Sequence, residues 1–472
     1  MLLRIDEDGA RRPVSQGHVK MELQNKATRI NLFDFKTPQM RAFHMTWLAF
    51  FLCFFGWFGL APMLAAVRTD LGLTTDQIVT TSLCAVASTV LMRLLIGWLC
   101  DAIGPRLAYT GLLVVGSIPI MAVGLSFDYT SFLLMRIAIG AIGASFVITQ
   151  YHTSMMFAPN CVGTANAVTA GWGNSGAGAA HFLMPLFFAA AVSLAGSAAL
   201  GWRVAMVVPG VVLMVTGVAY YFFTQDTPDG NFKDLRAAGK MPLRKQSSGT
   251  FKEACADSRV WSLFLIYGCC FGVELVVDSN IALYLMDYYE MTALAAGICG
   301  GLFGAMGIFA RPLGGYVADK VSISHGLRGR VLWLFAALFV EGIALIVFSQ
   351  MRTPGSIITL LVVTGMLVHM CCGATFAVVP FVNRKATGAV SGIVGAGGNA
   401  LAVALMFLFK ENVSGLAWPT AFLIMGALVV TLSFTTFVVR FSPEVEMDFR
   451  VAQQEAIARR RRQAVPMTAE AS

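Results

Sequence analysis

Two arginines inside long apolar segments are the residues best able to do chemistry in this sequence. Arg93 lies in TVLMRLLIGW and Arg311 in GIFARPLGGY, and both copies read R-x3-G-x3-D. A guanidinium group is always charged and offers paired donors, which suit a small planar or tetrahedral oxyanion. Charge within a bilayer is costly unless it faces a cavity and a counter-ion. No carboxylate is evident at the same depth in these two segments, so the pair predicts an anion site.

Two asparagines repeat in the same way. The segment VGTANAVTAGWGN, residues 162–174, aligns without gaps with TGAVSGIVGAGGN, residues 387–399, so that Asn174 matches Asn399. Glycine costs about 1 kcal/mol in a helix interior, so the many glycines here indicate tight packing or a backbone that approaches a ligand. An amide can donate to an oxyanion without adding charge. Each asparagine alone is as readily structural, and the duplication favours a binding role.

A turn motif follows each arginine. The first copy, GWLCDAIGPR, ends an apolar segment and turns into the next one. We expect Asp101 and Arg106 to pair with each other or with neighbouring helix ends, as a gate latch and not as substrate ligands. The motif residues are Gly97, Asp101, Gly104 and Arg106, with Gly315 and Asp319 in the partial second copy.

Ionisable residues in other apolar segments are candidates for proton coupling. Glu274 and Asp278 are four residues apart and so share a helix face, and carboxylates at membrane depth are proton-relay candidates. An ion pair with Arg136 or another basic residue, or exposure near the outer end, is an equal alternative. Arg136 itself is expected to extend to the interface. Glu341 is a similar but weaker candidate. The histidines at 152, 181 and 369 are weaker as well, because a lone helix histidine is more often a satisfied hydrogen bonder.

The elements that must position these residues are membrane-spanning helices. The chain has 472 residues, is 57% hydrophobic and 13% charged, and has a mean hydropathy of +0.71, which is a membrane composition. Apolar windows long enough to cross ~30 Å of hydrocarbon recur along it. They predict twelve helices, near 45–67, 78–100, 107–126, 131–157, 162–194, 202–224, 260–286, 292–318, 331–349, 355–381, 386–409 and 417–439.

The charge distribution predicts the topology. The net charge of +8 is concentrated in the N-terminal tail, in the 225–259 connection and after Arg440, which the positive-inside bias places in the cytoplasm. We therefore expect a cytoplasmic tail (1–44), a six-helix bundle (45–224), a cytoplasmic linker (225–259), a second six-helix bundle (260–440) and a basic cytoplasmic tail (441–472). The run Arg459–Arg462 is read as a solvated tail that touches anionic lipid, and nucleic acid is not an expected partner.

The two halves repeat, and many secondary transporters are built from such repeats, with the substrate site at their interface. The turn motif resembles the major facilitator superfamily, an all-α fold of two pseudo-symmetric six-helix bundles. Two stretches, FHMTWLAFFLCFFGWFGLAP (43–62) and YGCCFGVELVVDSNIALY (267–284), resemble its nitrate/nitrite porter branch. The resemblance implies that Arg93 and Arg311 clamp nitrate or nitrite, that Asn174 hydrogen-bonds the ion, and that Phe146 and Tyr267 line the site. Taken alone, Phe146 would more often be core.

Several functions remain open from the residues alone. Import against ~100 mV is opposed by about 2.3 kcal/mol per anionic charge, so proton symport or nitrate/nitrite exchange is expected. The alternatives are a transporter of another anion, such as an organic acid, and a nitrate-sensing membrane receptor. An enzyme is not expected, because the sequence has no Walker A segment and no nucleophile–base arrangement. Metal and cofactor sites are not expected either, since the ten cysteines show no zinc spacing. We expect a monomer in the inner or plasma membrane.

Overall fold

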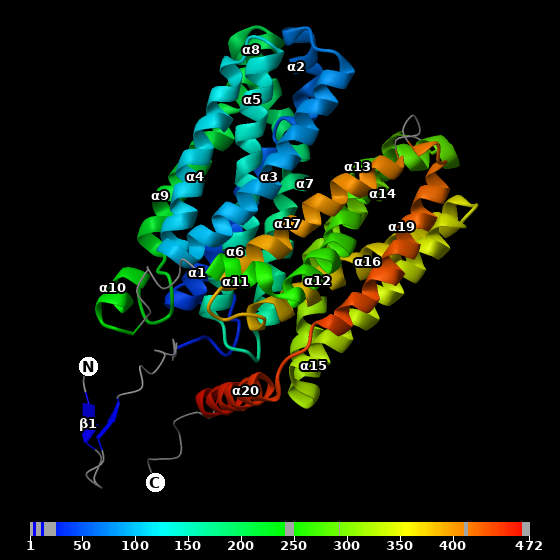
Figure 1. Ribbon diagram of the computed structural model, residues 1–472. Helices are drawn as coiled ribbons and strands as arrows, with labels where there is room; N and C mark the ends of the chain where they lie inside the picture. Colours follow the sequence, from blue (N-terminus) through cyan, green and yellow to red (C-terminus); the bar gives the residue numbers. More distant parts are fainter. Residues whose placement is uncertain are drawn as a thin grey trace, which may run out of the picture.

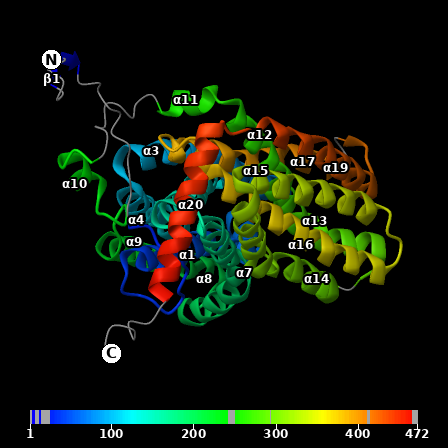
Figure 2. The ribbon, with the colours of Figure 1, turned by 90° about the horizontal axis from the view of Figure 1, so that it is seen from below.

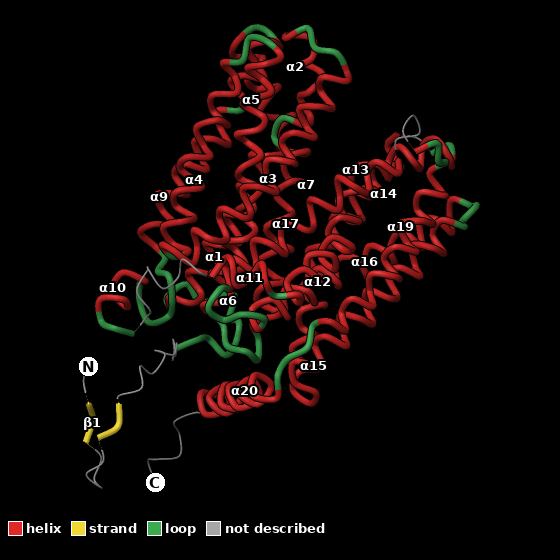
Figure 3. The backbone as a smooth tube through the Cα atoms, in the orientation of Figure 1, coloured by secondary structure: helices red, strands yellow, loops and turns green. Residues whose placement is uncertain are grey.

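The computed structural model describes residues 3–5, 11–13, 25–240, 250–291, 293–409 and 414–464. Apart from one antiparallel pair of three-residue strands, β1 (Leu3–Ile5) and β2 (Arg11–Pro13), these residues form helices and short connections (Figure 3). The predicted all-α class is therefore confirmed.

The first half of the chain contains six apolar helical segments, several of them built from shorter consecutive helices. They are formed by α1 (Pro38–Phe58), η1 (Ala61–Met63), α2 (Leu64–Leu71), α3 (Thr75–Ile103), α4 (Pro105–Ala122), η2 (Val123–Leu125), α5 (Tyr129–Gly140), η3 (Ala141–Ala144), α6 (Ser145–Met156), α7 (Val162–Ala195), α8 (Ala198–Ala205) and α9 (Val207–Phe223).

Two short helices, α10 (Phe232–Ala237) and α11 (Thr250–Ala256), precede the second half. That half is formed by α12 (Ser258–Tyr267), the π-helical η5 (Gly268–Gly272), α13 (Val273–Tyr289), α14 (Ala293–Ala305), α15 (Gly307–Ser349), α16 (Pro354–Val378), η6 (Val379–Phe381), α17 (Thr387–Met406), η7 (Phe407–Phe409), α19 (Trp418–Ser433), η8 (Phe434–Val438) and α20 (Pro443–Ala464).

The helical segments match the twelve predicted spans. Eleven segments of the described chain are long and apolar enough to cross a membrane, and one of them, Ile298–Ser349, has 52 residues. A straight helix of that length would measure about 78 Å, more than twice the hydrocarbon thickness. Gly326 divides it, because its φ of 66° and ψ of −152° break the helix. The segment therefore supplies two crossings, and the protein is a multi-pass membrane protein.

Local sequence explains where the helices begin. Proline occupies a first-turn position in α1, α4, α16 and α19, where its missing N–H and fixed φ cost nothing. Capping boxes begin α3, α5 and α16, with Thr74, Asp128 and Thr353 as the capping residues. Each satisfies backbone N–H groups that helical hydrogen bonding leaves open. The first span begins at Pro38, seven residues before the expected boundary at residue 45. The division into tails, bundles and linker remains a prediction.

The two halves form two bundles that meet at one end and diverge toward the other (Figure 1). Between the bundles, α3 packs on α17 and α7 packs on α15. The final helix, α20, crosses the end where the bundles meet (Figure 2). Large apolar side chains such as Phe182, Leu186, Val215 and Phe309 are exposed on the outer surface, as contact with lipid requires. The interface between the bundles holds the candidate site.

Candidate anion site between the bundles

Arg93 lies in α3 and is fully buried. Its Nη1 donates to the carbonyl oxygen of Gly395, in α17 of the other bundle, and its Nε lies 3.4 Å from the carbonyl oxygen of Gly143. Its Nη2 has no hydrogen-bond partner among the described residues. An unpaired buried guanidinium donor is costly, and this one remains available to an acceptor.

Arg311 lies in α15, is also buried, and has a different set of partners. Its Nη2 forms an ion pair with Glu274 Oε2 of α13. With the amide oxygen of Asn174 turned toward it, Arg311 donates from Nη1 and Nη2 to that oxygen at 2.8 Å. The same end of the amide lies 3.4 Å from Glu274 Oε1. Arg311 Nε has no hydrogen-bond partner among the described residues.

The ion pair corrects the expectation that both arginines lack a carboxylate. Glu274 comes from a third helix, and depth cannot be compared between helices from sequence alone. Of the alternatives for Glu274, pairing with Arg136 is wrong and pairing with another basic residue is right. Asp278 shares its helix but is exposed, with Oδ1 near Gly304 of α14. Arg136 does not extend to the protein surface as expected: it is buried, and its Nη2 lies 3.4 Å from Ser82 Oγ.

Aromatic rings surround both guanidinium groups. Phe271 lies between them, with its ring centre 5.5 Å from Arg93 Cζ and 5.4 Å from Arg311 Cζ. Phe146 lies 5.2 Å from Arg93 Cζ and stacks on Tyr267 at 5.6 Å between ring centres. Phe376 closes the group edge-on. The structure thus places both sequence-predicted aromatic residues here, together with two others that no sequence pattern distinguished from the remaining phenylalanines.

Two further polar groups of this region lack partners. The Tyr267 hydroxyl and both amide atoms of Asn399 have no hydrogen-bond partner among the described residues, and both residues are buried. Asn399 does not repeat the contact of Asn174. Arg93 donates instead to the carbonyl oxygen of Gly395, one turn before Asn399 in α17. The duplicated residues are therefore brought to one region, but their contacts are not symmetric.

The turn-motif aspartates join the bundles at the end where these meet. Asp101 accepts hydrogen bonds from the backbone N–H groups of Gly388 and Ala389 at 3.1 and 3.0 Å, at the start of α17. Asp319 accepts from the N–H groups of Gly163 and Thr164 at 3.1 and 2.7 Å, at the start of α7. A carboxylate at a helix N-terminus satisfies open donors and complements the helix dipole. Each aspartate thus caps a helix of the opposite bundle.

The motif glycines allow these contacts. A side chain at Gly97 would collide with the Gly388 carbonyl, and one at Gly315 with the Gly163 carbonyl. The helices can therefore approach this closely only because both positions are glycine. Gly104 has a φ of 92°, and any side chain there would meet the carboxylate of Asp226.

Of the two pairings expected for Asp101, the pairing with Arg106 is not formed. The Arg106 N–H instead donates to Asp226 Oδ1 at 2.9 Å, and its Nε donates to the Tyr221 carbonyl. Burial raises the pKa of Asp226, while the N–H groups of Phe232 and Arg106 act to lower it. Sequence reasoning did not single out Asp226; its only signal is an acidic residue in the turn-forming run QDTPDGN.

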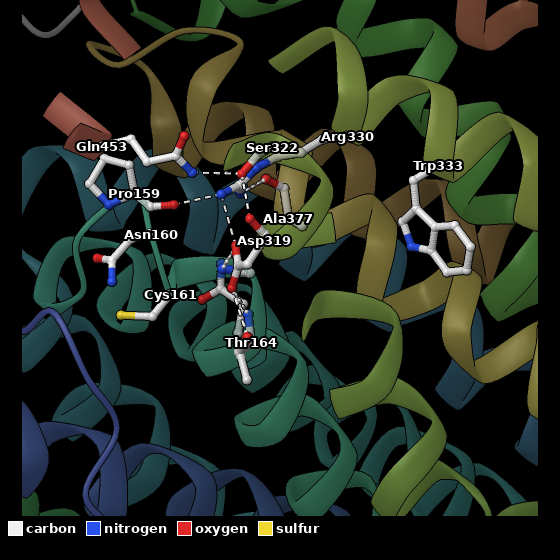
Figure 4. A network of polar contacts seen from close by, with 12 residues as sticks. Pro159, Asn160, Cys161, Thr164, Asp319, Ser322, Arg330, Trp333, Ala377 and Gln453 are labelled. Atoms are coloured by element: carbon white, nitrogen blue, oxygen red, sulfur yellow. Dashed lines mark hydrogen bonds and ion pairs between the residues drawn. The ribbon is translucent and has the colours of Figure 1, made fainter. Parts of the chain in front are cut away.

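Arg330 is a second residue that sequence reasoning did not single out. Figure 4 shows it joining both bundles: Nη2 lies 2.8 Å from Asp319 Oδ1 and donates to the carbonyl oxygen of Pro159 at 2.5 Å, while Nη1 donates to that of Ala377 at 2.7 Å. In the same network, Gln453 of α20 donates to Ser322 Oγ at 2.7 Å. In the sequence, Arg330 lies in the short connection between the predicted spans 292–318 and 331–349, where no pattern distinguished it from its neighbour Arg328.

Comparison with known proteins identifies the family. The profile of the Major Facilitator Superfamily matches residues 46–407. The chain is 34% identical to High-affinity nitrate transporter 2.3 of Oryza sativa subsp. japonica over 88% of this chain and 80% of that one. It is 34% identical to High affinity nitrate transporter 2.5 of Arabidopsis thaliana, over 89% of this chain and 84% of that one.

A bacterial relative extends the comparison. The chain is 27% identical to the nitrate/nitrite transporter NrtP of Nostoc punctiforme, over 85% of this chain and 92% of that one. Among solved structures, the human organic anion transporter MFSD10 has the same fold, with a TM-score of 0.60 at 14% identity, over 85% of this chain and all of that one. The chain belongs to the nitrate/nitrite porter family of the major facilitator superfamily.

Proposed function

We propose that the protein is a secondary transporter that moves nitrate and nitrite across the inner or plasma membrane by alternating access. The observation that carries the proposal is the convergence of Arg93 and Arg311 on one ring, Phe271, with an unpaired donor remaining on each guanidinium. The family relatives named as nitrate and nitrite transporters support the choice of ion.

The chemistry of the region suits a flat oxyanion. Guanidinium groups present parallel N–H donors that match two oxygens of a planar anion. The aromatic faces of Phe146, Tyr267 and Phe271 form an apolar wall for a weakly hydrated ion, and Asn174 and Tyr267 supply neutral polar groups. In this role Arg93 and Arg311 clamp the ion between them. Asn399 can supply a further donor, because neither of its amide atoms has a hydrogen-bond partner among the described residues.

The aspartate caps supply a gate. Asp101 and Asp319 hold the bundles together at the expected cytoplasmic end, so this arrangement is closed toward the cytoplasm. Release of the anion inside requires these helix caps to break, while the opposite ends of the bundles approach each other. Coupling is by proton symport or by nitrate/nitrite exchange, and Glu274 is the acidic residue placed to take part.

The test is uptake of labelled nitrate into proteoliposomes that contain the purified full chain. Arg93→Lys and Arg311→Lys should each reduce uptake to background, because an ammonium group lacks the two parallel, coplanar N–H donors that a guanidinium group offers to a planar anion. Arg136→Lys is the matched control, since Arg136 is also buried but lies away from the aromatic group and touches Ser82. Near-normal uptake by either clamp variant would remove that arginine from the site. Competition by organic acids as strong as that by nitrite would refute the choice of substrate.

A further inference from the structure

An apolar groove runs along the exposed surface of the first bundle, between α3 and α4. Its walls include Leu95 and Leu99 of α3 and Leu107 and Val115 of α4, and residues of α5 and η3 complete its lining. It encloses about 670 Å³. Helix α3 packs closely on α5, and α4 packs closely on α9, but α3 and α4 touch each other only sparsely. The space between these two helices is therefore open.

Small residues make the groove deep. Gly111 of α4 lines it and is exposed, and a Cβ at this position would meet nothing within 4 Å. Ala138 of α5 and Ala141 of η3 also line the groove. A larger side chain at Gly111 would thus project into the groove and not into a neighbouring helix.

The groove lies at the depth of the bilayer hydrocarbon. All of its lining residues belong to the spanning segments Thr80–Ile103, Pro105–Leu125 and Tyr129–Met156. Along α4 it extends from Leu107 to Ala122, about 22 Å at 1.5 Å per residue, which is longer than the ~15 Å of hydrocarbon in one leaflet.

The surroundings of the groove indicate what fills it. Leu95, Leu107 and Val115 are exposed among its lining residues, so the groove is continuous with the surface that faces lipid. Hydrocarbon chains are the solvent at this depth. A chain in a groove is contacted from several sides, as ligands in concave sites are, whereas a chain on a convex helix is contacted from one side only.

Arg106 lies at the cytoplasmic end of the groove, directly before Leu107. Its Nε donates to the Tyr221 carbonyl at 2.8 Å, and its Cζ lies 4.2 Å from the centre of the Tyr221 ring. Nη1 and Nη2 of Arg106 form no hydrogen bond with any described residue. These two donors match the oxygens of a phosphate group.

Three other charged side chains near this end already have partners. Asp226 accepts from the backbone N–H of Arg106, and Asp101 caps α17. Arg236 donates from Nη1 and Nη2 to the carbonyl oxygens of Ala102 and Asp101. Of these groups, the Arg106 guanidinium is the one with donors left for an external anion.

We infer that the groove holds one acyl chain of a membrane phospholipid, with the lipid phosphate on Arg106. The inference goes beyond the proposed function, because it does not depend on which ion the protein carries. The bound chain fills the space between α3 and α4, and α3 then contacts lipid on one face and α17 on another. The lipid thereby supports the helix that carries Arg93 and Asp101.

The test is lipid binding by the purified, delipidated full chain, measured by native mass spectrometry. The chain is titrated with phosphatidylglycerol, phosphatidylcholine and diacylglycerol that have the same acyl chains. Only the first two contain a phosphate, so the comparison isolates the contact with Arg106. Thermal unfolding of the same samples is an independent measure, because a ligand that binds only the folded state raises Tm.

Two kinds of variant separate the chain from the phosphate. Gly111→Trp fills the groove, and Gly111→Leu replaces it if the larger side chain prevents a monodisperse preparation. Gly301→Trp is the matched control, since a Cβ at Gly301 also meets nothing within 4 Å but lies in α14 of the other bundle. Arg106→Gln removes the guanidinium and keeps the backbone N–H that binds Asp226. Arg328→Gln, at an exposed arginine of α15, is its control.

The unmodified chain and both controls should retain one phospholipid with either headgroup, and their Tm should rise by several degrees. The Gly111 variant should bind all three lipids at least about tenfold more weakly, because its side chain occupies the site. Arg106→Gln should bind phospholipid about tenfold more weakly, as expected for loss of a charge-assisted hydrogen bond, while its affinity for diacylglycerol stays unchanged.

Equal lipid affinity of the Gly111 variant and the unmodified chain would overturn the groove as the binding site. Equal affinity of the unmodified chain for phospholipid and diacylglycerol would overturn the phosphate contact. A second polypeptide that copurifies with the unmodified chain and is lost from the Gly111 variant would show that a partner helix, and not a lipid, occupies the groove. None of these measurements requires transport, so each outcome leaves the proposed function untouched.

Discussion

At the scale of single residues, Phe271 deserves comparison with the arginines that it touches. It contacts both guanidinium groups at cation–π distance and stacks on Tyr267 at 5.3 Å. A cation over a desolvated ring is stabilised by ~1–2 kcal/mol. The ring therefore lowers the cost of holding two like charges close together before an anion arrives.

Replacing this ring should weaken anion binding. Phe271→Leu keeps an apolar side chain but removes the π face, so we expect the KM for nitrate to rise about tenfold, which corresponds to about 1.4 kcal/mol. The measurement is initial uptake rate against nitrate concentration in proteoliposomes. Phe335→Leu is the control, since Phe335 belongs to a separate aromatic group with Phe434 and Phe437. An unchanged KM would show that the ring is only packing.

The predictable site residues share one property. Arg93, Arg311 and Glu274 stand out in sequence because charge is rare in apolar segments, and repetition distinguishes Asn174 from other polar residues. Phe271 could not be found in this way, because it is one of 35 phenylalanines and its partners lie in distant helices. The Glu274–His369 contact was equally hidden, since no local pattern relates α13 to α16.

At the scale of helices, glycine decides how closely the two bundles can approach. Gly97 of α3 faces Gly388 and Gly392 of α17, and Gly315 of α15 faces Gly163 of α7, backbone against backbone. These contacts bring the helix starts within reach of Asp101 and Asp319.

An added methyl group should therefore open this end. Gly97→Ala and Gly315→Ala place a Cβ against a facing carbonyl, and overpacking of this kind costs about 1–3 kcal/mol. We expect transport to fall severalfold while the protein still reaches the membrane. Gly111→Ala and Gly301→Ala are matched controls, because a Cβ at either position meets nothing within 4 Å. Equal transport by all four variants would contradict a role for the close approach.

Helix positions were largely predictable because about 20 apolar residues are needed to cross the membrane. The break in the seventh span was not. There α12 and α13 are separated by the π-helical η5, which holds Phe271. Its sequence, GCCFG, has two glycines, which weaken an α-helix, but nothing in it specifies the wider turn. Gly268 and Gly272 pack closely against α17.

At the scale of the whole molecule, one end is joined by several independent contacts. Arg330 bonds to both bundles, and Phe449 of α20 is fully buried, 5.0 Å from the ring of Phe381. Phe449 belongs to a small apolar cluster that also contains Phe43 and Phe157 of the first half. The final helix therefore supports the closed arrangement, a role that its basic composition did not indicate.

Loss of the Arg330 contacts should shift the molecule toward the opposite arrangement. We expect Arg330→Gln to shorten the distance between spin labels at Phe127 and Gly355, which are both exposed. Phe127 lies in the connection between η2 and α5, and Gly355 lies in the first turn of α16. Pulsed electron–electron resonance measures this distance, in a background that lacks the partly exposed Cys84 and Cys255. Arg328→Gln, an exposed neighbour, is the control. An unchanged distance distribution would mean that Arg330 contributes stability without biasing the two arrangements.

The unequal surroundings of the two arginines bear on how the repeated halves have specialised. In the first copy the guanidinium is held by carbonyl oxygens, which keep the same charge at every pH. In the second copy it is held by the Glu274 carboxylate, whose charge depends on its protonation. The two copies of the repeat therefore keep the same arginine but give it partners of different charge. A substitution that neutralises Glu274 would alter the surroundings of the second arginine only, and the carbonyl contacts of Arg93 would stay as they are.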